Sequence, residues 1–375
     1  MRIPAATLFS LALSSALLTA VSPPGLPASR RTAPAPAPSQ AATTPDQRPD
    51  KGPFTLGVLR RDGVIIPFAH FDGRRWSNDW VTPNKTFDVP ISLNDVPERW
   101  WPGRKPILSW TAWPTQRSSR RIEAQAPVLL RAHCQRAVGL RTNWVPNEPP
   151  PPDGVQPYPK EGLATAGSAV LVEPVQLLAE GSPEWKMVAE AAHAEVTSRE
   201  RSAVGNLSAM WSHPVPEDQR AKTAFEPEVV LKSHDRTNGW VVYYFEGVKR
   251  YPAKPPRAGE RRQAVGWQIV GPGGQRLTIA PEPRGQATSC DLLSFASGWM
   301  TTSPGKKPAV RVNVDITDCN REGLVYTMPL GALRLDGKLV WVLQVSGYGY
   351  ERYEVVEIQE GRVKILQATP GGACG

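Results

Sequence analysis

The alternation of apolar and polar positions is clearest between residues 331 and 367, where it predicts an antiparallel meander of about four strands. The turns Asp336-Gly337 and Glu360-Gly361 lie between β-branched or aromatic runs. An Asp-Gly pair favours a type I′ hairpin, because both central residues of that turn need a positive φ. In the run between these turns, apolar residues occupy both faces: Leu339, Trp341, Leu343 and Val345 on one, Val340 and Val342 on the other. We therefore expect a central strand that is covered on both sides.

Similar patterns recur along the chain. Two turns, Asp62-Gly63 and Asp72-Gly73, predict a three-stranded meander near the start of the folded part. From residue 228 onward, β-branched and aromatic runs again alternate with turn residues. The predicted fold class is mainly β, with antiparallel meanders forming a sandwich or a half-barrel.

One segment has helical spacing, over about 183–202. Ser182 is suited to the N-cap position, and Pro183 and Glu184 suit the first turn. The apolar residues that follow recur on one face of a helix: Trp185, Val188, Ala189, Ala192 and Val196. We expect a single amphipathic helix that packs against a sheet.

The N-terminal region has the features of an export signal. A basic residue, an apolar run and a series of small residues make 1–22 a predicted signal peptide. The apolar run is too short for a transmembrane helix, and no cysteine follows it that could carry a lipid anchor. Residues 23–52 are rich in Pro and Ala and are expected to form a disordered tether. The sequence thus predicts a secreted or periplasmic protein.

Proline content suggests where the folded part is divided. The stretch 146–160 is a proline cluster, which we interpret as a linker or a long loop. It would separate a small basic β domain, 53–145, from a larger β domain with one helix, 161–375. The pattern leaves open whether these two units are one domain or two.

Charge is distributed unevenly. The net charge is +9, and residues 53–144 hold fourteen Lys and Arg against seven acids. Residues 145–375 hold twenty-five against twenty-six, so the basic excess is concentrated in the first half. A basic surface favours anionic partners.

The four cysteines fit an oxidising compartment. An even number of cysteines in an exported protein predicts disulfides, although sequence alone leaves three connectivities open. We favour Cys290 with Cys319, because both border strand-like runs, which leaves Cys134 with Cys374. Free buried thiols are the alternative. A zinc site is not expected, because no C-x-x-C pair is present.

Seven of the thirteen tryptophans lie in residues 74–144, interleaved with arginines. Flat aromatic faces beside guanidinium groups suit polysaccharides and anionic envelope polymers. The candidate ligand-binding residues are Trp76, Trp100, Trp101, Trp110, Arg74, Arg75 and Arg99. The alternative is that these tryptophans form the core of a small domain, with arginine side chains lying over them.

Catalytic and cofactor motifs are weak. The residues Ser233, His234 and Asp235 are of the types found in a catalytic triad, but neighbours on an extended strand point apart. The histidines have no metal-ligand spacing, and no glycine-rich loop has the residues that bind a nucleotide phosphate, so we expect neither metal nor cofactor. Nucleic acid is not an expected partner, because an exported protein rarely meets it. The oligomeric state stays open.

These observations favour a non-catalytic binding or structural protein of the cell envelope or extracellular space. The competing interpretation is a secreted hydrolase with its acid and base in the second unit, where several carboxylates lie along predicted strands: Asp315, Asp318, Glu351, Glu354 and Glu357. A glycosidase would need two of them at a defined separation.

Overall fold

The computed structural model describes residues 52–84, 87, 89–101, 108–114, 118–146, 148–152, 154–201, 203, 215–235, 239–252, 267–270, 276–279, 290–317, 321 and 323–374. The predicted signal peptide and nearly all of the predicted tether lie outside these residues. Most described residues are in antiparallel strands, so the mainly-β prediction is confirmed.

Seven strands make the first sheet, in the order β1-β7-β4-β5-β6-β2-β3. Their bounds are β1 (Phe54–Arg60), β2 (Val64–Phe71), β3 (Trp76–Asn78), β4 (Leu108–Pro114), β5 (Arg120–Ala132), β6 (Gln135–Thr142) and β7 (Lys160–Gly167). An additional pairing of β1 with β2 curls the sheet into a partial barrel.

The interior of the partial barrel is apolar. All strands except β3 contribute to one buried cluster, which includes Leu59, Ile65 and Trp110. Two short 3-10 turns, η1 (Leu93–Asp95) and η2 (Glu98–Trp100), lead further indoles into the same cluster. The loop that carries η2 therefore fills the barrel interior.

Two five-stranded sheets follow. We call β15-β14-β11-β10-β9 the helix-covered sheet and β19-β18-β17-β16-β8 the central sheet. The bounds of the first are β9 (Gln176–Leu177), β10 (Glu226–Asp235), β11 (Trp240–Pro252), β14 (Cys290–Thr302) and β15 (Ala309–Thr317). Those of the second are β8 (Leu171–Glu173), β16 (Tyr326–Leu335), β17 (Lys338–Gly347), β18 (Tyr350–Gln359) and β19 (Arg362–Ala373). A separate hairpin pairs β12 (Trp267–Val270) with β13 (Arg276–Ile279).

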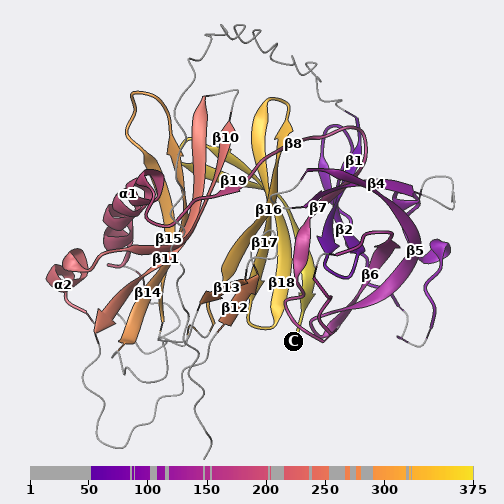
Figure 1. Cartoon of the computed structure of the whole chain (residues 1–375), viewed down its shortest axis with the longest axis horizontal. Coiled ribbons are helices and arrows are strands. Elements are labelled where there is room, and N and C mark those ends of the chain that lie inside the picture. The colour runs from indigo at the N-terminus through magenta and orange to yellow at the C-terminus, as the bar shows by residue number, and fades with distance from the viewer. Residues whose placement is uncertain are drawn as a thin grey trace, which may run out of the picture. The chain divides into compact units, whose positions relative to one another are not determined.

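The hydrophobic clusters order these layers. Val242 and Tyr244 of the helix-covered sheet share a cluster with Trp341 of the central sheet, so the two sheets form a sandwich. The opposite side of the central sheet, including Val340, packs against the outside of the partial barrel. In Figure 1 the layers run from α1 through the two five-stranded sheets to the first sheet.

Strand β17 confirms the prediction of a central strand covered on both sides. Trp341 and Leu343 face the sandwich interior, whereas Val340 and Val342 face the partial barrel. The turn before it has the predicted backbone, with φ of 50° at Asp336 and 77° at Gly337. The alternation in the sequence was therefore sufficient to place this strand.

Helix α1 (Pro183–Arg199) forms where the sequence predicts it and ends about one turn earlier than expected. The Ser182 side chain accepts a hydrogen bond from the Trp185 backbone N–H. Val188, Ala192 and Val196 are buried against the outer face of the helix-covered sheet. A second short helix, α2 (Glu217–Lys222), was not predicted. No helix in the described part of the chain is both long and apolar enough to cross a membrane.

The proline-rich stretch 146–160 connects two strands of one sheet. Strand β7 begins at its end and pairs with β1 and β4, so it belongs to the first sheet and not to a second domain. Leu163 of β7 also shares a cluster with Leu333 and Val342 of the central sheet. The units expected at 53–145 and 161–375 thus share a core within one compact unit. Proline-rich composition indicates backbone outside a sheet, but it does not distinguish an interdomain linker from a loop.

Candidate functional site

The predicted tryptophan platform is not an exposed surface. Trp100, Trp101 and Trp110 are at most 2% exposed and lie inside the partial barrel. Trp76 is half-buried and packs against Phe54 and Phe71. This corrects the expectation that these rings face solvent, and the alternative of core tryptophans describes them better. Indoles bury more apolar area than most other side chains, so a small barrel gains more from enclosing them than from displaying them.

The three candidate arginines are exposed, whereas Trp100, Trp101 and Trp110 are buried. Arg74 and Arg75 lie on the β2–β3 turn, where their backbone N–H groups donate to Asp72 Oδ1 at 2.7 Å. Those two hydrogen bonds lower the pKa of the Asp72 carboxyl. Arg99 forms an ion pair with the buried Asp79, whose other oxygen accepts a hydrogen bond from Trp100 Nε1 at 2.8 Å. Arg99 therefore holds the barrel-filling loop in place.

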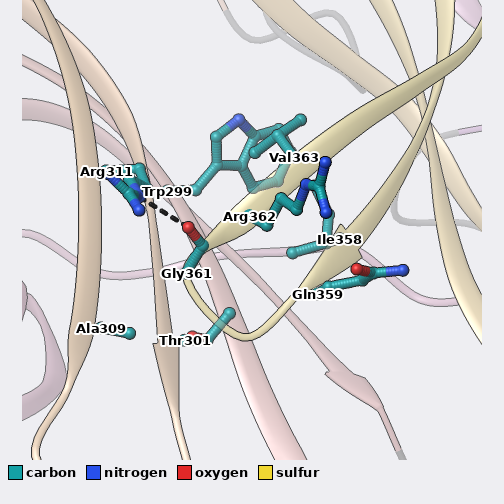
Figure 2. Close-up of a pocket in the computed structure, with 9 residues that line it drawn as sticks. All are labelled: Trp299, Thr301, Ala309, Arg311, Ile358, Gln359, Gly361, Arg362 and Val363. Atoms are coloured by element: carbon teal, nitrogen blue, oxygen red, sulfur yellow. Dashed lines mark hydrogen bonds between the residues drawn. The ribbon is translucent and has the colours of Figure 1, made fainter.

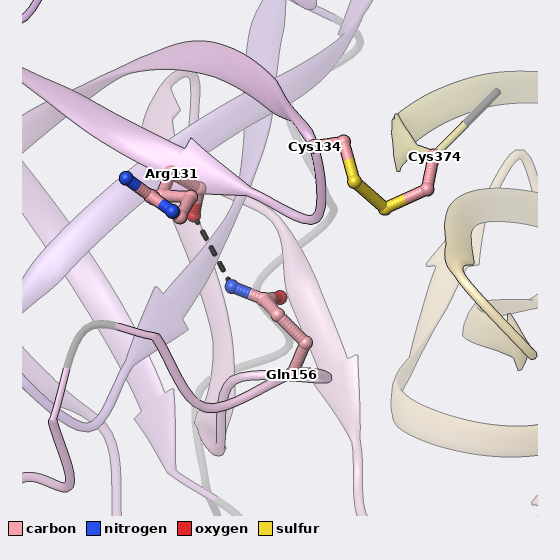
Figure 3. Close-up of a disulfide and its surroundings, with 4 residues drawn as sticks. All are labelled: Arg131, Cys134, Gln156 and Cys374. Atoms are coloured by element: carbon pink, nitrogen blue, oxygen red, sulfur yellow. Dashed lines mark hydrogen bonds between the residues drawn. A yellow bond between two sulfur atoms is a disulfide. The ribbon is translucent and has the colours of Figure 1, made fainter.

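The Cys134–Cys374 disulfide is present, with a Cα–Cα distance of 4.7 Å. Figure 3 shows it joining the turn between β5 and β6 to the end of the chain, near the hydrogen bond from Gln156 to the Arg131 carbonyl oxygen. Cys319 lies outside the described residues, so the Cys290–Cys319 pairing stays a prediction.

The carboxylates considered for a hydrolase are mostly ion-paired. Glu351 is buried and meets Lys160 at 3.1 Å, and Glu354 and Glu357 meet cationic side chains at 2.6 and 2.9 Å. Asp315 is half-buried, and burial raises its pKa. Asp318 lies outside the described residues.

The Ser-His-Asp stretch of β10 points to alternating faces, as expected. Ser233 and Asp235 are each 1% exposed, whereas His234 between them is exposed. These adjacent residues do not form a triad with one another.

The best-defined candidate site lies at one edge of the sandwich, where β15 and β19 are the terminal strands of their sheets. Figure 2 shows a crevice there, formed by β14, β15 and the β18–β19 hairpin. It is lined by Trp299, Thr301, Ala309, Arg311, Ile358, Gln359, Gly361, Arg362 and Val363. Strand register places Trp299 opposite Arg311, so both side chains face the central sheet.

Local contacts hold the two sheets together at this edge. Arg311 Nε donates to the Gly361 carbonyl oxygen at 2.6 Å, and the Lys306 ammonium lies 3.1 Å from the Glu360 carboxylate. The Trp299 ring is fixed edge-on against Tyr244 and Trp341, with centroids 5.0 Å apart in each case. The crevice therefore has a rigid base.

Two cationic side chains, those of Arg311 and Arg362, line the crevice, and three more lie on the adjoining turn and strand. We call Lys306, Lys307, Arg311, Arg362 and Lys364 the cationic edge; all five are exposed. Two carboxylates lie beside members of this edge: Glu360 forms an ion pair with Lys306, and Glu357 lies opposite Lys364 across the β18–β19 pair. Although burial raises the pKa of Glu357, hydrogen bonds from Gln359 and Lys338 and the charges of Lys338 and Lys364 leave it below the usual value. Five cations against two carboxylates give this edge a positive potential.

The crevice is shallow, and no space large enough for a water molecule lies between its walls. A ligand could therefore contact only its mouth, where the guanidinium groups of Arg311 and Arg362 are exposed. The hydroxyl of Thr301 is buried in the wall and has no hydrogen-bond partner among the described residues. Guanidinium groups at an exposed rim suit the binding of carboxylate, sulfate or phosphate groups.

Sequence reasoning missed this edge because charge was counted over long segments. The second half of the chain is nearly neutral in total, and the five cations come from two hairpins more than fifty residues apart. The local signals were the pair Lys306-Lys307 and the alternating cations at Arg362 and Lys364. Only the sandwich brings them together.

Comparison with protein-family models, with curated proteins and with solved structures found no match to this chain.

Proposed function

We propose that the protein is an exported, non-catalytic binding protein of the cell envelope or extracellular space, and that its ligand is an anionic polymer held at the cationic edge. The observation that carries the proposal is the gathering of five exposed cations around a shallow crevice with two nearby carboxylates. Export is supported by the N-terminal sequence pattern and agrees with an exposed disulfide.

A polymer suits this edge better than a small molecule. Small-molecule sites are normally concave and enclose most of their ligand. The crevice encloses nothing, whereas the cations extend from the β14–β15 turn to β19. A repeating anionic ligand such as an acidic polysaccharide could bind several of these cations at once. Each exposed ion pair contributes little free energy, but several pairs formed by one ligand together raise its affinity.

The secreted hydrolase remains the second interpretation. It has less support, because Glu351, Glu354 and Glu357 are each paired with a cation. A hydrolase would turn over its ligand, whereas a binding protein would retain it unchanged.

The experiment is retention of the purified protein on matrices that carry polyglutamate, alginate or polyphosphate. The double variant Arg311→Glu with Arg362→Glu is compared with a matched control, Arg74→Glu with Arg75→Glu, which makes the same change in net charge on the β2–β3 turn. We expect the wild type and the control to elute from at least one matrix at the same salt concentration, and the edge variant to elute earlier. Failure of all three matrices to retain the wild type would reject the function, and equal elution of the two variants would reject the site.

A further inference from the structure

Strand β19 has one open edge over part of its length. Among the described residues it pairs only with β18. Its C-terminal half is covered by the first sheet, where Thr369 Oγ1 donates to the Phe68 carbonyl oxygen at 2.9 Å and Gly372 lies close against Ala132. In its N-terminal half, Arg362 and Lys364 are exposed. The stretch 362–367 of β19 therefore has an unpaired edge. This stretch is long enough to pair with another strand of ordinary length.

An apolar residue lies on this open stretch. Ile365 is 55% exposed, although its cross-strand partner Val356 belongs to the sandwich core. Directly opposed residues share a face, so Ile365 points toward the side of the helix-covered sheet. Val363 points the same way and packs against the sandwich core. Ile365 therefore lies exposed at the gap between the edges of β15 and β19.

Strand β15 forms the other side of this gap. Arg311 and Asn313 alternate with Val312, which packs beneath helix α1, so both face the central sheet and both are exposed. A strand added to β19 would meet Ile365 and Arg311 on one face and Arg362 and Lys364 on the other. The best partner would alternate apolar with acidic residues.

We propose that the anionic polymer is a polypeptide, and that an extended acidic segment of it adds to the 362–367 edge of β19 as a further strand. This inference rests on the proposed function, because it uses the same cationic edge. A polypeptide fits better than a polysaccharide because the edge offers a row of backbone N–H and C=O groups, which another backbone satisfies in register. Exposed Ile365 adds an apolar contact for alternate side chains of the partner.

A second copy of the same edge is a poor occupant. Pairing two copies through β19 would bring Arg362 and Lys364 of both chains together, and like charges on neighbouring strands are destabilising. Cations on an edge strand discourage such self-pairing. An acidic segment has the opposite charge and removes that repulsion.

The experiment is fluorescence anisotropy of a labelled, end-capped ten-residue peptide that alternates Glu with Val or Thr. The probes compared with it are the same peptide with alternate backbone nitrogens methylated, a peptide with Lys in place of Glu, and alginate as competitor. We expect the acidic peptide to bind and the Lys peptide not to bind. Backbone methylation should weaken binding about tenfold or more, because it removes main-chain donors and leaves the charges unchanged.

Variants locate the site. The double variant Arg362→Glu with Lys364→Glu should bind the acidic peptide about tenfold more weakly than the wild type. The double variant Arg74→Glu with Arg75→Glu should bind it with unchanged affinity. If the methylated peptide binds as tightly as the unmethylated one, strand addition is overturned, whereas anion binding at the edge still stands. Binding of alginate without any binding of the acidic peptide would overturn the polypeptide and keep the proposed function. If no anionic probe binds, both proposals fail.

Discussion

At the residue scale, three buried glutamates share one arrangement, in which a tyrosine hydroxyl donates to the carboxylate. The pairs are Tyr244 with Glu246, Tyr251 with Glu200, and Tyr353 with Glu351. Two of them also meet a buried lysine, and Glu246 receives the Thr327 backbone N–H instead. Because a buried charge is costly unless it is paired, these clusters should respond strongly to pH and to substitution.

Glu246 gives a pH-dependent prediction. Burial raises its pKa to about 7, against the lowering effect of hydrogen bonds from Tyr244 and Thr327. The folded protein thus holds a proton on Glu246 that the unfolded chain, in which a glutamate has its ordinary pKa of 4.5, releases at lower pH. The stability from this group is complete below pH 4.5 and is lost as the pH rises through 7. The free energy of unfolding of Glu246→Gln, relative to that of the wild type, should rise by up to about 3 kcal/mol between pH 4.5 and pH 8.

Denaturant unfolding at pH 4.5, 6 and 8 measures this difference. Glu360→Gln, which removes an exposed ion pair on the β18–β19 turn, is the control, and its effect on the free energy of unfolding should stay below about 1 kcal/mol at each pH. If the difference in free energy of unfolding between Glu246→Gln and the wild type does not change with pH, the raised pKa of Glu246 is contradicted.

Lys249 and Glu200 give a second residue-scale prediction. The Lys249 ammonium donates to Thr197 Oγ1 at 2.6 Å, to Glu200 Oε2 at 3.1 Å and to the Arg220 carbonyl oxygen at 2.9 Å. Both side chains of the ion pair are inaccessible to solvent. Lys249→Met leaves a buried carboxylate without its cation and should lower the free energy of unfolding by about 3–5 kcal/mol.

Adding Glu200→Gln to Lys249→Met should recover part of that loss, because no unpaired charge then remains. Lys306→Met, which removes an exposed ion pair, should cost less than about 1 kcal/mol. Equal losses for Lys249→Met and Lys306→Met in urea unfolding would refute the buried-pair account.

At the element scale, the α1 N-terminus depends on a single side-chain cap. Ser182 Oγ accepts from the Trp185 N–H at 3.3 Å, and α1 carries much of the apolar cover of the helix-covered sheet. Ser182→Ala should destabilise the protein by about 1 kcal/mol, and Ser182→Asp should retain most of the stability. Thermal unfolding measures both. Loss of stability in Ser182→Asp equal to that in Ser182→Ala would show that the cap does not contribute.

Elements with a local signal could be predicted from the sequence, whereas pairing between distant strands could not. Strand β17 and helix α1 follow from apolar spacing and turn or cap residues within about twenty positions. The assignment of β7 to the first sheet depends on partners about fifty and one hundred residues away, in β4 and β1. The short helix α2 has no apolar face that repeats, so periodicity gave no signal for it.

The candidate site shows the same limit. Alternating Arg362 and Lys364 can be found in the sequence, but their nearness to Arg311 requires the β15 and β19 edges to lie on one side of the sandwich. For the tryptophans, the sequence suggested a binding surface that the fold does not form. Their density beside arginines is plain in the sequence, but their burial depends on the partial barrel closing around them.

At the scale of the whole molecule, the Cys134–Cys374 disulfide joins positions 240 residues apart and fixes the end of β19 to the first sheet. Its main effect should be to restrict the unfolded chain. Changing both cysteines to serine should lower the free energy of unfolding by about 5 kcal/mol in the chain-entropy description. Thermal unfolding with and without reductant tests this, and the variant should lose most of its sensitivity to reductant. A variant as stable as the oxidised wild type would contradict the prediction.

Hydrogen–deuterium exchange of the whole protein, with and without polyglutamate, shows directly whether an anionic polymer binds at the cationic edge. We expect slower exchange in peptides that cover 306–311 and 360–367, with little change in the β2–β3 turn around Arg74 and Arg75. Protection centred on that turn, or no protection at the edge under conditions where polyglutamate is bound, would contradict this expectation.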